Sequence, residues 1–226
     1  MIIKIDISLV KSNKYENQLN IKDNKFGQLM HLYSLAMREV EEKVNSINRD
    51  YKGIYEQDLI NHVVCRVKTP ESIIKKMRRK NYELTYKNLI ENINDIAGVR
   101  IICQAKDDVF EVVDIIKEFE DCRIVREKDY ITHPKKTGYS SYHMIIEVPV
   151  QLNEAKIYAK VEVQIRTLAM DFWATLEHQI KYKSNGEISP KVSRDLVIYA
   201  KIINKIDNRL MKLNNRKFKK KLELSE

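Results

Sequence analysis

The segment 160–183 constrains the fold of this chain most strongly, because the spacing of its apolar residues changes at Thr167. Before that residue, apolar and polar side chains alternate: Val161, Glu162, Val163, Gln164, Ile165 and Arg166. A spacing of two places the two sets on opposite faces of a strand. After it, apolar residues recur at intervals of four, at Leu168, Phe172, Leu176 and Ile180. We therefore expect a half-buried strand, whose polar face is either solvated or the floor of a site, followed by a helix that packs its apolar stripe against the sheet.

The remaining secondary structure follows from the same two periods. The expected helices are 26–49, 57–64, 69–80, 85–93, 107–119 and a long one from 189 to at least 213. The expected extended segments are 66–68, 95–103, 122–125 and 142–148. The turn at 152–155 should join the last of these to the opening strand as an antiparallel hairpin. Thr69, followed by proline, and Thr85 are typical helix caps.

This order of elements predicts an α+β domain with helical extensions at both ends. We expect an N-terminal tail or edge segment at 1–25, one domain at 26–213 and a basic tail at 214–226. No apolar run reaches membrane-spanning length and no signal pattern opens the chain, so no membrane association is expected. Cys65, Cys103 and Cys122 lack paired or metal-ligand spacing, which indicates free thiols in a reducing cytoplasm.

A cluster of seven basic side chains and one serine is the first candidate site. The formal net charge is +9, which suits an anionic partner such as a nucleotide, RNA or a membrane surface. The cluster contains Arg66, Lys68, Ser72, Lys75, Lys76, Arg78, Arg79 and Lys80. Ser72, Lys76 and Arg79 share one helix face, and arginine forks bind phosphate in bidentate fashion. The cluster is either a phosphate-binding wall or a solvated basic face.

Two carboxylates and a glycine-led block are the other candidates. Asp95 and Glu162 lie at or on strands, and Mg²⁺ takes one or two carboxylates together with substrate phosphates. Glu162 could equally accept a proton from an attacking hydroxyl, while a structural ion pair is the alternative for both. In the block GYSSYH, Tyr139 offers a flat face for a base and His143 a hydrogen bond, although either could be a packing residue. The chain contains no P-loop, dinucleotide-binding or zinc motif.

Five segments occur in an order that resembles the synthetase domain of the RelA/SpoT family, and most closely its small, single-domain alarmone synthetases. They are RVKTPESIIKKMRRK, NDIAGVRIIC, REKDYI, GYSSYH and VEVQIRTLAMDFWATLEH. The resemblance implies a mixed β-sheet of about five strands with surrounding helices, related to nucleotidyltransferases. It also implies transfer of the β,γ-pyrophosphate of ATP to the 3′-hydroxyl of GTP or GDP, giving AMP and the alarmone (p)ppGpp of the stringent response.

The resemblance assigns a role to each candidate residue. The residues that would bind ATP are Arg66, Lys68, Ser72, Lys76, Arg79 and Arg100, with Arg66 and Arg100 holding adenine between them. Lys128, Tyr139, His143 and Gln164 would bind GTP, with Tyr139 stacking on guanine. Asp95 and Glu162 would be catalytic and would share Mg²⁺, the implied cofactor. Lys135 and Lys136 would close over the phosphates.

Departures from the family pattern refine these expectations. Ser140 stands where many members have Arg or Gln, and the REKD segment at 126–129 has the basic form that the family pattern links with GTP rather than GDP. No His-Asp dipeptide occurs, so no alarmone hydrolase is expected. The family also implies a homo-oligomer, typically a tetramer, with single-stranded RNA as a regulator. The alternatives are a toxic relative that pyrophosphorylates the 3′ end of tRNA and a non-catalytic RNA-binding protein.

Overall fold

The computed structural model describes residues 18–152, 155–184 and 188–223, and most of the expected N-terminal segment 1–25 lies outside these ranges. Its sheet contains the five strands β1 (Ile60–Val67), β2 (Ala97–Cys103), β3 (Arg123–Asp129), β4 (Tyr142–Leu152) and β5 (Ala155–Thr167). Their spatial order is β1-β2-β5-β4-β3. The β2–β5 pair is parallel and the other pairs are antiparallel. The expected mixed five-stranded sheet and the β4–β5 hairpin are therefore confirmed.

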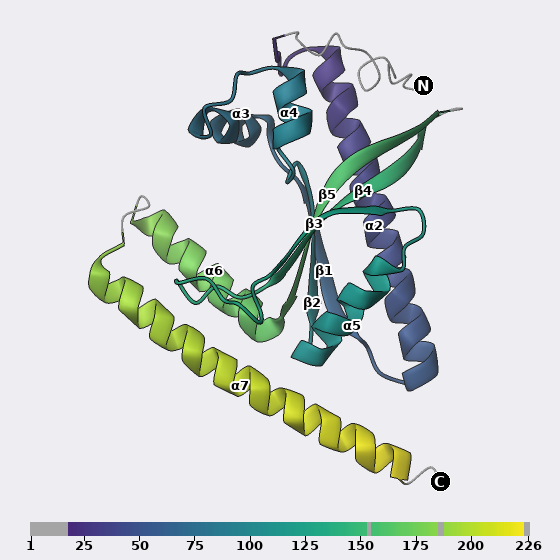
Figure 1. The fold of residues 1–226 in the computed structure, drawn as a ribbon, viewed down its shortest axis with the longest axis vertical. Helices are drawn as coiled ribbons and strands as arrows, with labels where there is room; N and C mark the ends of the chain where they lie inside the picture. Colours follow the sequence, from purple (N-terminus) through teal and green to yellow (C-terminus); the bar gives the residue numbers. More distant parts are fainter. Residues whose placement is uncertain (1–17, 153–154, 185–187, 224–226) are drawn as a thin grey trace.

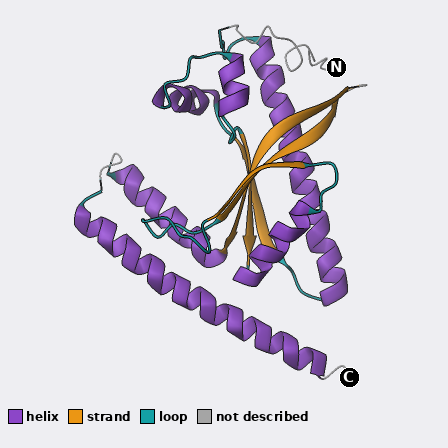
Figure 2. Cartoon of the chain, in the orientation of Figure 1, coloured by secondary structure: helices purple, strands orange, loops and turns teal. Residues whose placement is uncertain are grey.

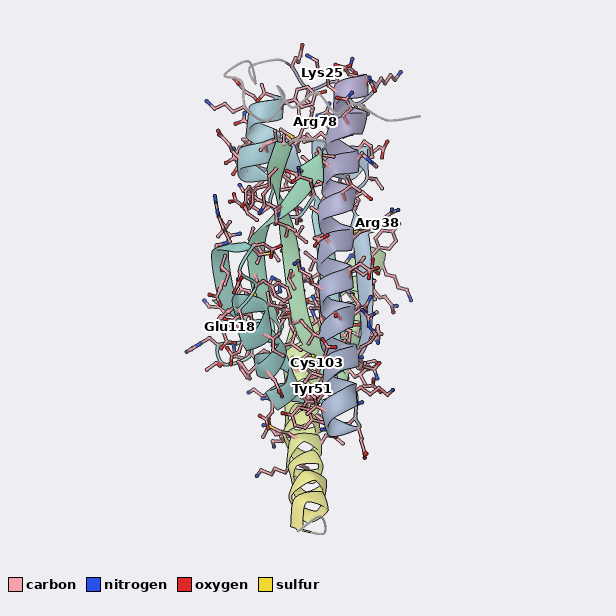
Figure 3. The ribbon with its side chains drawn as sticks, turned by 90° about the vertical axis from the view of Figure 1, so that its right-hand side faces the viewer. Lys25, Arg38, Tyr51, Arg78, Cys103 and Glu118 are labelled. Carbon is pink, nitrogen blue, oxygen red and sulfur yellow. The ribbon has the colours of Figure 1, made fainter. Side chains whose placement is uncertain are left out.

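One face of the sheet carries the main hydrophobic core. Helices α2 (Asn24–Tyr55) and α5 (Lys106–Lys117) cover this face, on the right of the sheet in Figure 1. Figure 3 looks onto α2, which runs along the sheet from Lys25 to Tyr51. Ala36, Val40 and Val44 of α2 are fully buried, as are Val161, Val163 and Ile165 of β5. The alternation in β5 thus places its branched residues in the core, as the sequence predicts.

The opposite face of the sheet stays open between two groups of helices. Helices α3 (Pro70–Arg79) and α4 (Tyr86–Asn92) lie at one end, and α6 (Leu168–Lys183) and α7 (Pro190–Glu223) lie at the other (Figure 2). The three polar side chains of β5 point to this side. The open face, rather than the core, is therefore where a site can form.

Hydroxyl caps fix the starts of three helices. The side chains of Thr69, Thr85 and Thr167 accept hydrogen bonds from the backbone N–H groups of Ser72, Asn88 and Met170. Each bond satisfies one of the amides that a helix start leaves without a partner. The helices expected from Thr69 and Thr85 are confirmed, and the cap at Thr167 ends β5 and begins α6 without a connecting loop.

The expected short helix at 57–64 is wrong, because most of that segment belongs to β1. Val63 and Val64 are branched residues that favour an extended backbone. The strand pairs with β2, with Val64 opposite Arg100 and Arg66 opposite Gly98. Pairing with a distant strand, which local spacing does not reveal, decided the structure of this segment.

The packing expected for α6 is also wrong. Leu168 and Phe172 are 46% and 64% exposed, whereas Met170, Trp173 and Glu177 form the buried face. The helix follows β5 immediately after Thr167, so the direction of that strand sets which face turns inward. The apolar stripe at intervals of four is therefore not part of the core, since Leu168 and Phe172 are exposed while Leu176 and Ile180 are half-buried.

The long C-terminal helix, expected to reach at least residue 213, is confirmed. The structure extends α7 to Glu223, so the basic segment 216–221 lies within helix by its backbone. The division into 1–25, 26–213 and 214–226 stays a prediction. None of the helices in the described ranges is both long enough and apolar enough to cross a membrane.

Candidate active site

Strand pairing brings the expected site residues into two adjacent rows on the open face. In one row, Lys128 of β3 pairs with His143 of β4, His143 with Gln164 of β5, and Gln164 with Arg100 of β2. Residues paired across strands point to the same face, so these four side chains form one line. Side chains from four strands of the sheet thus meet in one row.

The second row contains Glu162, with a gap beside it. Glu162 pairs with Gly98 of β2, and Gly98 pairs with Arg66 of β1. An added Cβ at Gly98 would meet nothing closer than 3.9 Å. The glycine therefore leaves a space between the guanidinium of Arg66 and the carboxylate of Glu162.

The first of two hollows on this face includes that space. Its lining residues are Val64, Arg66, Asp95, Gly98, Val99, Arg100, Glu162 and Gln164. Both arginines that were expected to hold adenine line it, together with both carboxylates that were expected to share a metal ion. We call it the donor hollow.

Asp95 is the most strongly paired carboxylate of the donor hollow. Its Oδ2 atom lies 3.1 Å from the Nζ atom of Lys68 and 2.6 Å from that of Lys76. Burial acts to raise the pKa of Asp95, but the hydrogen bond from Lys76 and the charge of Lys68 outweigh it, and the net pKa is lowered. The structure thus places two of the expected phosphate-binding lysines beside the expected metal ligand.

A second hollow lies on the other side of Glu162. Its lining residues are Arg126, Glu127, Lys128, Tyr130, Lys135, His143, Ile145 and Glu162. Lys128 and His143 are residues expected to bind GTP, and Lys135 belongs to the loop expected to close over phosphates. We call it the acceptor hollow. Glu162 lines both hollows and separates them.

Tyr139 lies beside the acceptor hollow and contacts its residues. The Tyr139 ring packs edge-on against Tyr130, His143 and Trp173. Its hydroxyl lies 2.8 Å from Nε2 of His143. Burial, and then the charges of Arg166, Lys135 and Lys128, lower the pKa of His143 to about 3, so its imidazole is neutral. The neutral ring suits a hydrogen-bonding role rather than that of a phosphate-binding cation.

Four of the expected ATP-binding residues do not line the donor hollow: Lys68, Ser72, Lys76 and Arg79. Ser72 and Arg79 are exposed on α3, and the Ser72 hydroxyl accepts a hydrogen bond from Thr69 at 3.0 Å. Lys76, on the same helix, turns inward to Asp95. Of the α3 residues assigned to ATP, the structure therefore brings Lys76 to the carboxylates, while Ser72 and Arg79 stay at the rim.

The donor hollow fits a divalent cation. Asp95 Oδ1 is buried and has no hydrogen-bond partner among the described residues. Those residues include no group of three or more His, Cys, Asp or Glu that could hold a metal. Mg²⁺ does not require such a group, because one or two carboxylates and the substrate phosphates suffice. Asp95 and Glu162 together meet this requirement.

Sequence reasoning left three contributors without a role. Arg166 is 4% exposed and lies under the site, paired with Asp171 in the first turn of α6 at 3.0 Å. Asp171 also pairs with Arg100, at 3.3 Å. Tyr130 stacks edge-on against both Tyr139 and His143. All three had a signal in the sequence, since Tyr130 lies in the segment REKDYI, and Arg166 and Asp171 lie in the segment VEVQIRTLAMDFWATLEH.

A further, mostly apolar hollow lies behind the loop before Gly138, between α6 and α7. Met170, Trp173, Val197 and Ala200 are among its lining residues. It shares Lys135 with the acceptor hollow and also includes Lys136, so the loop expected to close over the phosphates is the one part of the expected site that it touches. The chemistry of the site therefore lies in the donor and acceptor hollows.

Comparison with known proteins gives a family match and two similar relatives. Residues 65–187 match the family model described as the region found in RelA / SpoT proteins. The chain is 44% identical over 180 residues to the GTP pyrophosphokinase YwaC of Bacillus subtilis (80% of this chain, 86% of the relative). It is 36% identical over 191 residues to the GTP pyrophosphokinase YjbM of the same organism (84% and 89%).

A solved structure shares the fold. The small alarmone synthetase 1 of Bacillus subtilis, bound to its product pppGpp, superposes with a TM-score of 0.78 at 35% identity. The alignment covers 86% of this chain and 98% of that one. Since both the family model and close relatives match most of the folded region, the chain belongs to the RelA/SpoT family and is most similar to its small alarmone synthetases.

Proposed function

We propose that this protein is a GTP pyrophosphokinase that transfers the β,γ-pyrophosphate of ATP to the 3′-hydroxyl of GTP, giving AMP and pppGpp. The observation that carries the proposal is the position of Glu162 between the donor and acceptor hollows. A group that accepts the proton of an attacking hydroxyl must reach that hydroxyl where it meets the other substrate, and this position is between the two hollows. The relatives named GTP pyrophosphokinases and the pppGpp-bound neighbour support the same reaction.

The residues of the two hollows divide the work of the reaction. Arg66 and Arg100 bind adenine in the donor hollow, and Lys68 and Lys76 bind ATP phosphates. Lys128 and His143 of the acceptor hollow orient the acceptor nucleotide together with Gln164, which lines the donor hollow, and the face of Tyr139 stacks on guanine. The acceptor 3′-oxygen bonds to the β-phosphorus, the bond from that phosphorus to the α,β-bridging oxygen breaks, and AMP leaves. Catalysis then depends mainly on positioning and charge neutralisation.

Mg²⁺ is the proposed cofactor, with Asp95 and Glu162 as its protein ligands. Bound there, it would neutralise the charge that develops on the transferred phosphates. Asp95 holds its unpartnered oxygen ready for a cation while Lys68 and Lys76 occupy the other. When ATP enters, its phosphates offer these two lysines an alternative anion, which frees the carboxylate.

The reaction is tested with labelled ATP, Mg²⁺ and one acceptor at a time. We expect labelled pppGpp with GTP, ppGpp with GDP at a lower rate, and no labelled product with total tRNA. Glu162→Gln keeps the shape of the side chain and should lower kcat by about 100-fold or more, the usual contribution of a general base. Labelling of tRNA, or an absence of 3′-pyrophosphorylated guanosine nucleotides, would overturn the proposal.

We also propose that the protein is a homo-oligomer. Ile198, Ile202, Ile206 and Leu210 form an exposed stripe on α7, each about half exposed, and Phe172 of α6 is exposed as well. Such a stripe is the seam that helices use to pack against one another. Light scattering should show a tetramer for the wild type, and smaller species for Ile202→Asp. A monomeric wild type at micromolar concentration would exclude the assembly.

We further propose that single-stranded RNA regulates the protein and that the protein acts in the cytoplasm. The basic charge of the chain supports single-stranded RNA as a regulator, and its binding should weaken steeply with salt. Cys65, Cys103 and Cys122 are free thiols, which suits a reducing compartment such as the cytoplasm.

A further inference from the structure

Arg166 makes more side-chain hydrogen bonds than any other residue described at the site. It lies at the end of β5 on the open face, below the two hollows, and is 4% exposed. Its Nε atom donates to the hydroxyl of Ser141 at 3.2 Å, and its Nη1 atom donates to Asp171 at 3.0 Å. The Nη2 atom donates to Tyr139 Oη at 2.6 Å and to Gln164 Oε1 at 2.5 Å. Neither hollow includes Arg166 in its lining, so it acts on the substrates through other residues.

The bond to Gln164 fixes the orientation of that amide. A guanidinium only donates hydrogen bonds, so the group of Gln164 that meets it must be the carbonyl oxygen. The amide nitrogen then faces the other way, and it donates to Glu162 Oε2 at 2.9 Å. A carboxylate only accepts hydrogen bonds, so Glu162 requires the same orientation of the Gln164 amide as Arg166 does. Arg166 therefore holds one oxygen of Glu162 through Gln164.

The bond to Tyr139 fixes the position of a proton on His143. The hydroxyl of Tyr139 has one hydrogen, and Arg166 already donates to its oxygen. That hydrogen therefore points to Nε2 of His143, 2.8 Å away, which must be the nitrogen without a proton. The other acceptor within reach is the Ser141 hydroxyl, which already accepts from Nε of Arg166, so Nε2 of His143 is the acceptor that we assign to this hydrogen.

The proton of the neutral His143 ring is then on Nδ1. This atom faces Glu162 Oε1 at 3.9 Å. At this distance the two groups face each other without a hydrogen bond in the structure, and we expect the contact to shorten when substrate binds. Two series of side-chain contacts thus start at Nη2 of Arg166. One ends at Oε2 of Glu162 through Gln164, and the other ends at Oε1 of Glu162 through Tyr139 and His143.

We propose that Arg166 is a positioning residue that orients both oxygens of the Glu162 carboxylate, through Gln164 on one side and through Tyr139 and His143 on the other. The inference rests on the proposed function, in which Glu162 accepts the proton of the 3′-hydroxyl. A hydrogen bond from Gln164 holds one oxygen and Nδ1 of His143 faces the other, which favours the rotamer that turns the carboxylate toward the two hollows. A side chain that is already ordered in this way loses little further conformational entropy when the hydroxyl binds.

The guanidinium is required for this arrangement, and a positive charge alone does not replace it. Arg166 reaches Ser141, Asp171, Tyr139 and Gln164 in four directions from one planar group. The ammonium of lysine is a single point with three donors and cannot span these positions. Asp171 neutralises the buried charge in either case. Arg166→Lys therefore separates the directed bonds from the charge.

The first test reads the proton position directly. Long-range ¹H–¹⁵N correlation spectra distinguish the two tautomers of a neutral histidine, and a His143→Gln variant assigns the signal among the five histidines of the chain. We expect Nδ1–H in the wild type without substrates. Arg166→Lys and Tyr139→Phe should both populate Nε2–H, because neither keeps the directed hydroxyl proton. An Nε2–H tautomer in the wild type overturns the proposal.

The second test measures kinetics on the same variants. Arg166→Lys should lower kcat by about tenfold or more, with the KM for ATP within about twofold, because it disturbs a general base and not the donor hollow. Tyr139→Phe keeps the ring packing and removes only the hydroxyl, so it tests the same chain if Arg166→Lys folds poorly. Wild-type kcat in both variants, at an unchanged melting temperature, overturns the proposal.

The two proposals fail in different ways. If Glu162→Gln retains turnover, the base is another group, and the tautomer of His143 still reports whether Arg166 orders the chain. If Glu162→Gln is inactive while Arg166→Lys keeps both the wild-type tautomer and kcat, the reaction stands and the positioning role is wrong.

Discussion

The ammonium of Lys76 lies 2.6 Å from Oδ2 of Asp95, while Oδ1 of the same carboxylate is buried without a partner among the described residues. One oxygen is thus neutralised by the protein, together with Lys68, and the other remains available to a ligand. The carboxylate joins Lys76 of α3, and Lys68 just after β1, to the edge of β2 where the donor hollow opens. A single residue therefore connects the phosphate-binding side to the proposed metal-binding side.

Asp95→Asn should abolish most activity without unfolding the protein. The change removes a charge from the proposed Mg²⁺ site and leaves two lysines facing each other without their anion. We expect kcat/KM to fall by about 100-fold or more, and the Mg²⁺ concentration at half-maximal rate to rise. Glu91→Gln, an exposed acid on nearby α4, is the control and should behave as wild type. Full activity of Asp95→Asn would remove this residue from the site.

Gly98 should tolerate a methyl group but not a long side chain. The nearest atoms to an added Cβ are the backbone oxygens of Arg66 and Glu162, both at 3.9 Å, which is ordinary contact. Gly98→Ala should therefore keep its stability and activity, whereas the side chain in Gly98→Leu would enter the donor hollow. Calorimetry with a non-hydrolysable ATP analogue should show binding weakened by about tenfold or more, which is about 1.4 kcal/mol. Binding of GTP should not change, and equal loss of both nucleotides would contradict the separation of the hollows.

Gly138 should be intolerant of any side chain. Its φ is +89°, and a Cβ would lie 2.3 Å from the Cβ of Ala200 on α7. Gly138→Ala should push the loop away from α7, raising the KM for GTP while the β-sheet core remains folded. Adding Ala200→Gly relieves the contact but not the strained φ, so we expect partial recovery. In the control Gly27→Ala, on α2 with no atom within 4 Å, helix stability should rise by about 0.5–1 kcal/mol.

Asp108 should make stability depend on pH in the acid range. Burial raises the pKa of Asp108 to about 6, although its carboxylate accepts a hydrogen bond from the Ala105 N–H at 2.8 Å. The unfolded chain has the ordinary value of about 4, so the folded state binds the proton more tightly. The free energy of unfolding should therefore decline between pH 4 and 6 through this residue and stay level above.

Asp108→Asn isolates this effect, because the amide keeps an oxygen for the Ala105 N–H but cannot ionise. Denaturant unfolding at several pH values should show the variant gaining stability relative to the wild type between pH 4 and 6. Above pH 6 the difference should be constant. A difference that does not vary over this range would contradict the raised pKa.

The sequence by itself determined the local structure and most of the site's membership. Alternation in β5 separated Glu162, Gln164 and Arg166 from the core residues, because side chains on a strand alternate between faces. Threonine caps placed the starts of α3, α4 and α6, since hydroxyls satisfy helix amides at close range in the chain. These features depend on neighbours within a few residues, which is why they are legible in one sequence.

The tertiary structure decided what depends on distant neighbours. Segment 57–64 became mostly strand because β2 was available to pair with it, and the stripe on α6 faced outward because β5 fixed the direction of the helix. Arg166 had no role in the sequence, since its partner Tyr139 lies 27 residues away. Hydrogen-bond direction in that network is set by which donors and acceptors the sheet brings together. Only the folded sheet therefore revealed how Glu162 is oriented.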